Sequence, residues 1–229
     1  MQTILAAPAS AEPTLDAPPP PLREFWRGFR RNPGAVLGLL YFGIVVVCAL
    51  GADLLAPYSP SEQFRNALLV PPFWADNSHP DFLLGTDDLG RDMLSRLLHG
   101  ARLSLLIGLC SVLLSMGPGI LLGLLAAFYP RWLGNAITRL MDVMMALPAL
   151  LLAVAVVAVL GPGLINTMIA IAIVNLPHYV RLTRASAMGE RNKDYVVATV
   201  VANARLPRLM FLSVLPNCMA PLIVTATLG

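Results

Sequence analysis

The segment LSLLIGLCSVLLSMGPGILLGLLAAF, Leu103 to Phe128, runs for 26 residues without a charged side chain. As a helix it would be about 39 Å long at 1.5 Å per residue, enough to cross a bilayer core of about 30 Å. Gly117-Pro118-Gly119 interrupts the segment, and neither piece alone is long enough to cross. We therefore predict one long, kinked membrane span here, and this span sets the class of the whole protein.

Four further apolar stretches are predicted to cross the membrane, and the tight turn Gly161-Pro162-Gly163 separates two of them. These spans are residues 35–52, 143–160, 164–180 and 209–229. Charged residues make up 13% of the chain, about half of the ~25% usual in soluble domains. Hydrophobic residues make up 57%, and the mean hydropathy is +0.71. We expect an all-α membrane protein, a polytopic helical bundle of five spans over residues 35–229.

The composition argues against several functional classes. The formal net charge of +3 is too small to suggest nucleic-acid binding. Cys48, Cys110 and Cys218 each lie inside an apolar run, with no spacing typical of a metal site or a disulfide framework. The sequence motifs of serine nucleophiles, phosphate-binding loops and zinc helices do not occur. We therefore expect no catalytic residue, metal site or cofactor site in this chain.

The N-terminal region is predicted to consist of a tail and a short amphipathic helix. Residues 1–21 are rich in Pro and Ala and have no signal-peptide pattern, which favours a disordered tail. Residues 22–34 place apolar and basic side chains on opposite helical faces. The apolar residues are Leu22, Phe25, Trp26 and Phe29, and the basic residues are Arg23, Arg27, Arg30 and Arg31. This pattern predicts a helix that contacts membrane lipid at the headgroup layer.

Basic residues predict the orientation of the spans. With the N-terminus inside, the inside segments carry twelve Lys and Arg residues and the outside segments carry four. Because Lys and Arg concentrate on the cytoplasmic side, this distribution favours a cytoplasmic N-terminus. Residues 53–102 then form an outside loop, and residues 181–208 form a cytoplasmic loop between the fourth and fifth spans.

Three polar contacts near the span ends are predicted from sequence spacing. Thr86 is expected to cap an outside helix with two acidic residues in its first turn. On that helix Asp92 and Arg96 are four residues apart and are expected to pair. Asp142 lies three residues after Arg139 at the predicted end of a span, and we expect these two side chains to pair at the membrane edge.

The cytoplasmic loop contains a short segment, VVATVVA at residues 196–202, that is apolar on every side. A helix of this kind needs cover on more than one face. The spans can cover one face, and a partner protein could cover the other in a helix-in-groove contact. The alternative is an ordinary loop helix that rests on its own bundle. Asn203 tolerates a left-handed conformation and is predicted to end the helix.

The sequence resembles the membrane permease subunits of ABC importers for dipeptides and oligopeptides, most closely the second of the two paralogous subunits. The resemblance covers residues 22–229 and depends on five stretches in order. They are LGTDDLGRDMLSRLLHGARLSL (84–105), ALPALLLAVAVVAVLGP (146–162), LPHYVRLTR (176–184), DYVVAT (194–199) and LPNCMAPLIV (215–224). It implies the type I, MetI-like permease fold.

The resemblance also implies a coupling helix, the EAA loop, over residues 192–204. This helix would dock in a groove on a separate cytoplasmic ATPase. The residues assigned to ATPase coupling are Lys193, Asp194, Tyr195, Val196, Val197, Ala198, Thr199, Val200, Ala202, Asn203 and Ala204. The usual Glu-Ala-Ala and the glycine that follows read Val197, Ala198, Thr199 and Asn203 here, so only the first alanine matches.

The family further implies partners and a location. The chain would form a peptide path across the bacterial inner membrane together with a paralogous permease subunit. Two cytoplasmic ABC ATPase subunits would hold ATP and Mg²⁺, and a periplasmic or lipid-anchored binding protein would deliver the substrate. Nucleotide would bias the spans between outward-facing and inward-facing states. The chain itself is therefore expected not to be an enzyme.

Two alternatives remain open from the sequence. Subunits of this family cross the membrane a sixth time, whereas this chain ends at Gly229, so an assembly fragment that does not transport is one alternative. An intramembrane aspartyl protease that uses Asp53 and Asp142 is the other. The predicted topology places these two acids at opposite membrane faces, where they could not share a water molecule.

Overall fold

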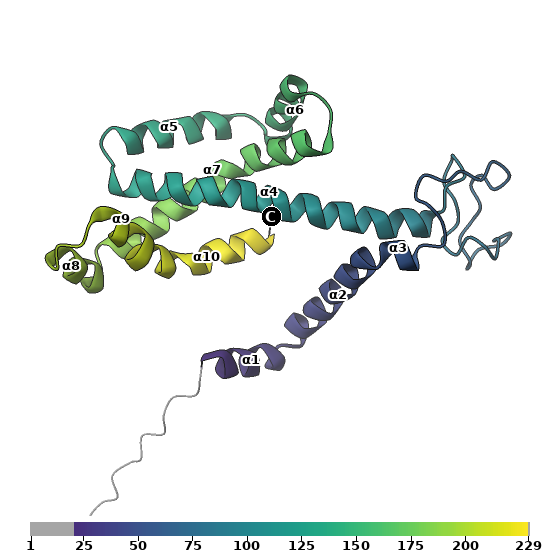
Figure 1. Ribbon diagram of the computed structural model, residues 1–229, viewed down its shortest axis with the longest axis horizontal. Helices are drawn as coiled ribbons and strands as arrows, with labels where there is room; N and C mark the ends of the chain where they lie inside the picture. The colour runs from purple at the N-terminus through teal and green to yellow at the C-terminus, as the bar shows by residue number, and fades with distance from the viewer. Residues whose placement is uncertain (1–20, 229) are drawn as a thin grey trace, which may run out of the picture. The chain divides into compact units, whose positions relative to one another are not determined.

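A computed structural model describes residues 21–228, and all the regular elements in this range are helices (Figure 1). They are α1 (Pro21–Arg31), α2 (Pro33–Leu50), α3 (Ala52–Leu55), α4 (Met93–Phe128), α5 (Leu133–Ala146), α6 (Ala149–Leu160), α7 (Leu164–Arg191), α8 (Asp194–Val201), α9 (Leu206–Arg208), the π-helix η1 (Leu209–Val214) and α10 (Leu215–Leu228). The tail predicted over residues 1–21 lies outside the described residues, apart from Pro21, the first residue of α1.

The chain divides into two compact units, Met1–Cys48 and Ala49–Gly229. In the first unit α1 is helical over most of the predicted amphipathic segment. The rings of Trp26 and Phe29 stack with centroids 5.7 Å apart, and the Arg30 guanidinium lies 5.0 Å from the centre of the Trp26 ring. A Trp that carries a stacked Phe and a cation is compatible with the headgroup layer, and that location stays a prediction.

Three helices or helix runs are long and apolar enough to cross a membrane. They are Pro33–Leu50, Met93–Phe128 and Leu206–Leu228, the last of which includes α9, η1 and α10. The helix α7 is 28 residues long but carries polar side chains within its apolar part and does not join this set. The structure therefore supports a helical membrane protein with three spans, or four if α5 and α6 count as one, and does not confirm the predicted five.

The region predicted as a single span at residues 143–160 is divided between two helices. α5 ends at Ala146, Leu147 is extended, and α6 begins after Pro148 with a bend of 99° between the two axes. The sequence reason is local, because a proline disfavours helical geometry at the residue before it. In contrast, α4 continues as one α-helix through Pro118, which confirms the predicted single long span, while the kink stays a prediction.

The core of the second unit is the packing of α4 against α7. Small residues recur at every fourth position on the α4 face that is buried: Ser111, Ser115, Gly119, Gly123 and Ala127. A Cβ atom built on Gly119 would lie 2.5 Å from Cβ of Tyr179, and one on Gly123 would lie 2.5 Å from Cβ of Thr183. The two backbones approach closely because these positions lack side chains, as in other membrane helix pairs.

The loop that the sequence predicts to lie outside is held to the start of α4 by polar contacts that differ from the predicted ones. Thr86 does not cap a helix: it is buried in the loop, where its hydroxyl donates to the carbonyl of Ala67 at 2.6 Å. α4 begins seven residues later, and its N-cap is Asp92, whose carboxylate accepts from the backbone N–H of Ser95 at 2.8 Å and from its hydroxyl at 2.6 Å. Thr86 is held in the loop ahead of the helix, because the Thr86 hydroxyl also accepts a hydrogen bond from the backbone N–H of Val70 at 2.9 Å.

The two predicted ion pairs are also replaced. Asp92 is occupied as the cap, so Arg96 pairs instead with Asp87. Asp142 pairs with Arg181 of α7 at 2.5 Å, and not with Arg139 on its own helix. Spacing along one helix identified Arg96 and Asp142 as residues that form ion pairs, but not their partners. Each pairs with a residue outside the predicted helical pair.

Candidate functional site

The helix α8 lies in the segment that the sequence predicts as a cytoplasmic coupling loop. It begins after Lys193, whose backbone is extended, and Asp194 in the first turn complements the positive end of the helix dipole. Asn203 has φ 57°, and its N–H donates to the carbonyl of Val200 at 2.9 Å. This left-handed residue ends the helix as the sequence predicts, which confirms the assignment of Asn203.

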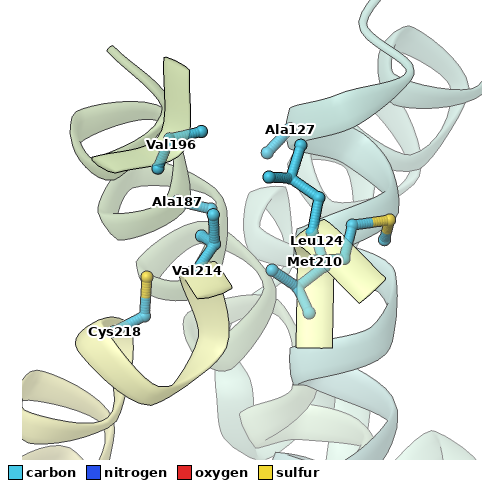
Figure 2. Close-up of a cluster of buried hydrophobic side chains, with 8 residues drawn as sticks. Leu124, Ala127, Ala187, Val196, Met210, Val214 and Cys218 are labelled. Atoms are coloured by element: carbon cyan, nitrogen blue, oxygen red, sulfur yellow. The ribbon is translucent and has the colours of Figure 1, made fainter. Parts of the chain in front are cut away.

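One face of α8 packs into the bundle through a single fully buried side chain. Val196 is 2% exposed and belongs to a cluster that joins α4, α7, η1 and α10 (Figure 2). The cluster consists of Leu124, Ala127, Ala187, Val196, Leu209, Met210, Val214 and Cys218. Burying a valine contributes roughly 1.5–3 kcal/mol, so this contact anchors α8 to the ends of the long helices.

The other faces of α8 present apolar side chains to the surroundings. Val197, Val200 and Val201 are 51%, 56% and 80% exposed. Of the eleven residues predicted for coupling, Val196 is buried, Thr199 and Ala204 are half-buried, and the other eight are exposed. Adjacent exposed valines on a charged loop form an apolar patch, and patches of this kind mark surfaces that contact protein or membrane.

A carboxylate at the end of α7 holds the first turn of α8. Glu190 accepts a hydrogen bond from the hydroxyl of Tyr195 at 2.7 Å and from the ammonium of Lys193 at 2.7 Å. These two bonds lower the pKa of Glu190, with the Lys193 bond the larger cause. Burial, followed by the bond to the Glu190 carboxylate, raises the pKa of Tyr195 to about 12. Glu190 is not among the predicted coupling residues, although its position three residues before Lys193 is a recognised ion-pair spacing.

Two hollows border α8. A smaller one of about 300 Å³ lies between its valines, Phe128 at the end of α4, and Leu206 and Leu209. A wider one of about 830 Å³ is lined by the C-terminal part of α8 together with Arg205 and Arg208. The helix therefore lies between two hollows, one lined mostly by apolar side chains together with Arg191, and one that includes two arginines. A partner surface of complementary shape and charge could contact both.

The helix α8 and the loop predicted to lie outside are at opposite ends of α4. The loop is fixed to the start of α4, where Asp53 pairs with Arg102 at 2.9 Å and approaches His99 at 3.3 Å. Phe128, the last residue of α4, borders α8. Because α4 has 36 residues, its ends are roughly 54 Å apart, well beyond a bilayer core of about 30 Å.

The same geometry separates the two acids of the protease alternative. Asp53 contacts Arg102 near the start of α4, whereas Asp142 lies with Val180 beside the part of α7 that packs on Gly123. Arg102 and Gly123 are 21 positions apart on α4, which corresponds to about 30 Å. Over residues 21–228 no group of three or more His, Cys, Asp or Glu side chains is placed to hold a metal ion.

Comparison with known proteins agrees with this arrangement. The family described as "Binding-protein-dependent transport system inner membrane component" matches residues 119–229, which include α8. The family described as "N-terminal TM domain of oligopeptide transport permease C" matches residues 20–72.

Individual relatives match over nearly the whole chain. The di/tripeptide transport system permease protein DppC of Pseudomonas aeruginosa is 64% identical over 100% of this chain and 75% of its own length. The dipeptide transport system permease protein DppC of Escherichia coli K12 is 54% identical over 94% of this chain and 72% of its own length. The glutathione transport system permease protein GsiD of Pectobacterium atrosepticum is 37% identical over 89% of this chain and 66% of its own length. Sequence, helical architecture and relatives together establish that the chain belongs to the family of inner-membrane permease components of binding-protein-dependent ABC transport systems.

Proposed function

We propose that this chain is one of two paralogous permease subunits that form a path for dipeptides and oligopeptides across the bacterial inner membrane. The observation that carries the proposal is the 64% identity over the entire chain to a di/tripeptide transport permease. Relatives from two further species, at 54% and 50% identity, are dipeptide transport permeases. Because these three relatives agree, we favour dipeptides and tripeptides as the substrates over glutathione, for which the 37% identical relative is named.

We propose further that α8 couples this path to two cytoplasmic ABC ATPase subunits, which bind ATP and Mg²⁺. Two features of α8 support this proposal. Val196 is buried and fixes the helix to the bundle, while Val197, Val200 and Val201 are exposed and form an apolar surface. A groove on an ATPase could enclose these valines and transmit its closure through Val196 to the ends of α4, α7 and η1. Because Val196 packs against these helices, a displacement of α8 would move their ends with it.

The proposal includes a cytoplasmic N-terminus and a substrate-binding protein on the other side. The distribution of basic residues supports the orientation, and the opposite placement of α8 and the 53–102 loop along α4 is compatible with it. The loop would face the periplasm, where a soluble or lipid-anchored binding protein would deliver the peptide. No observation favours the assembly-fragment alternative.

The test is ATP-driven uptake of a labelled dipeptide by proteoliposomes that contain the full complex. Val201→Glu places a charge at the most exposed valine of α8, and we expect it to abolish uptake by preventing burial of the helix. Val201→Leu is the matched control, because it preserves the apolar surface, and we expect it to keep uptake. Uptake by the Val201→Glu complex at the wild-type rate would contradict the coupling role of α8.

A further inference from the structure

A separate hollow of about 370 Å³ lies between α5 and α7, away from α8. Its apolar part is formed mainly by Met141, Val180 and Met188, and its polar part includes Asp142 and two arginines, Arg181 and Arg184. Neither the coupling proposal nor the family comparison uses this hollow.

The hollow has an excess of positive charge. Asp142 is its one carboxylate among the lining residues, and Arg181 already pairs with it at 2.5 Å. Arg184 is half-buried, and its Nε atom is buried without a hydrogen-bond partner among the described residues. No carboxylate of the described residues pairs with Arg184, because Asp142 is occupied by Arg181, so the hollow favours an acceptor that carries negative charge.

The position of the arginines along α7 sets the depth of the hollow in the membrane. α7 begins at Leu164, and residues 164–180, without an acidic or basic side chain other than His178, correspond to about 26 Å of helix. The sequence predicts residues 164–180 as a span, and on that topology Arg181 and Arg184 follow where a bilayer core of about 30 Å ends, at the depth of the lipid phosphates. The apolar residues of the hollow lie next to them, where acyl chains begin.

From this combination we infer that the hollow between α5 and α7 binds an anionic phospholipid. The phosphate accepts hydrogen bonds from the Arg184 guanidinium, which presents planar donors suited to phosphate oxygens. The first acyl carbons pack on Met141 and Met188. Basic pockets between transmembrane helices on the cytoplasmic side bind lipid headgroups in this way. The inference depends on the depth of α7 in the membrane and not on peptide transport.

The test is native mass spectrometry of the full chain in detergent, titrated with phosphatidylglycerol or with phosphatidylcholine of the same acyl chains. We expect one high-affinity phosphatidylglycerol per chain, and about fivefold weaker binding in Arg184→Gln, since one arginine near a membrane surface contributes roughly 1 kcal/mol. Arg139→Gln is the matched control: it removes the same charge from an exposed residue of α5 outside the hollow, and binding should not change.

A second variant tests the hollow without changing the charge. Ala185 is exposed and lines the hollow, so Ala185→Phe should fill it and weaken phosphatidylglycerol binding while both arginines remain. The inference is overturned if phosphatidylcholine binds as tightly, if Arg139→Gln weakens binding as much as Arg184→Gln, or if inorganic phosphate at equal concentration displaces the lipid. It is also overturned if Arg184→Gln and Ala185→Phe leave lipid binding unchanged but release a co-purified second permease subunit, because the hollow would then be a subunit contact.

Discussion

The hydroxyl of Tyr195 donates to the carboxylate of Glu190 across the junction between α7 and α8, with 2.7 Å between the oxygens. Lys193, in the two-residue connection, donates to the other oxygen of the same carboxylate. One acidic side chain at the end of a long helix therefore fixes the first turn of the helix that we propose to contact the ATPases. This contact and the burial of Val196 hold α8 by separate means, one polar and one apolar.

Removal of the Tyr195 hydroxyl should loosen α8. We expect Tyr195→Phe to increase amide hydrogen exchange in residues 194–201 about fivefold, because a net hydrogen bond contributes roughly 1 kcal/mol and local opening reports that contribution. Tyr129→Phe is the control, because Tyr129 is exposed and its hydroxyl makes no hydrogen bond within the described residues. Equal exchange in the two variants would show that the Glu190 contact does not hold α8.

The same contact gives a pH dependence whose sign follows from the two pKa shifts. The pKa of Tyr195 is raised from 10.0 to about 12, so its contribution to stability is complete below pH 10 and is lost as the pH rises through about 12. The pKa of Glu190 is lowered from 4.5, so its contribution is present above pH 4.5 and is lost as the pH falls below that value. The tyrosinate absorbance that differs between the wild type and Tyr195→Phe should appear near pH 12. A difference spectrum that titrates near pH 10 would disprove the contact.

Helix packing predicts a contrast between glycines of α4. In Gly123→Ala the new methyl group would meet Thr183 at 2.5 Å and the carbonyl oxygen of Val180 at 2.8 Å, so we expect a loss of about 1–3 kcal/mol in stability. Gly117→Ala, with nothing within 4 Å, should be neutral or slightly stabilising, because alanine favours helix. Thermal unfolding in detergent measures both. Equal transition temperatures for the two variants would argue against the close α4–α7 approach.

The start of α4 predicts a similar contrast between acidic residues. Asp92 is 2% exposed and caps the helix through the N–H of Ser95, so Asp92→Ala should cost about 1–2 kcal/mol. Asp88→Ala, at an exposed residue that the sequence analysis placed in the first turn of the helix, should leave stability unchanged. Thermal unfolding again provides the measurement. If Asp88→Ala is the more damaging substitution, the helix begins where the sequence alone suggested.

Some of these features could be predicted from the sequence alone, and others could not. Runs of apolar residues identified the long helices, and the conformational tolerance of Asn203 identified the end of α8. Both features are local, so spacing and residue type suffice. The cap on α4 was placed six residues too early, because the loop uses Thr86 for a contact with Val70 and Ala67 that no local pattern reveals.

Tertiary partners explain the other differences. Asp142 finds Arg181 on another helix, which spacing along α5 could not predict. The bend between α5 and α6 occurs at Pro148, a residue that the sequence shows. A proline alone does not predict a break, because α4 contains Pro118 and stays continuous. Neighbouring helices decide whether a proline breaks a span. The small residues at every fourth position of α4 were the signal in the sequence that could have identified the helix pair.

The central claim is that the exposed valines of α8 face the cytoplasm and are covered by ATPase subunits. Val201→Cys, in a chain whose Cys48, Cys110 and Cys218 are replaced by alanine, tests both parts with a membrane-impermeant maleimide. Trp74→Cys, at a residue 68% exposed in the outside loop, is the control for the opposite side. We predict that Val201→Cys reacts in inside-out vesicles only and becomes protected when the ATPase subunits assemble, while Trp74→Cys reacts in right-side-out vesicles only. Reaction of Val201→Cys from the outside, or labelling that the ATPase subunits do not reduce, would contradict it.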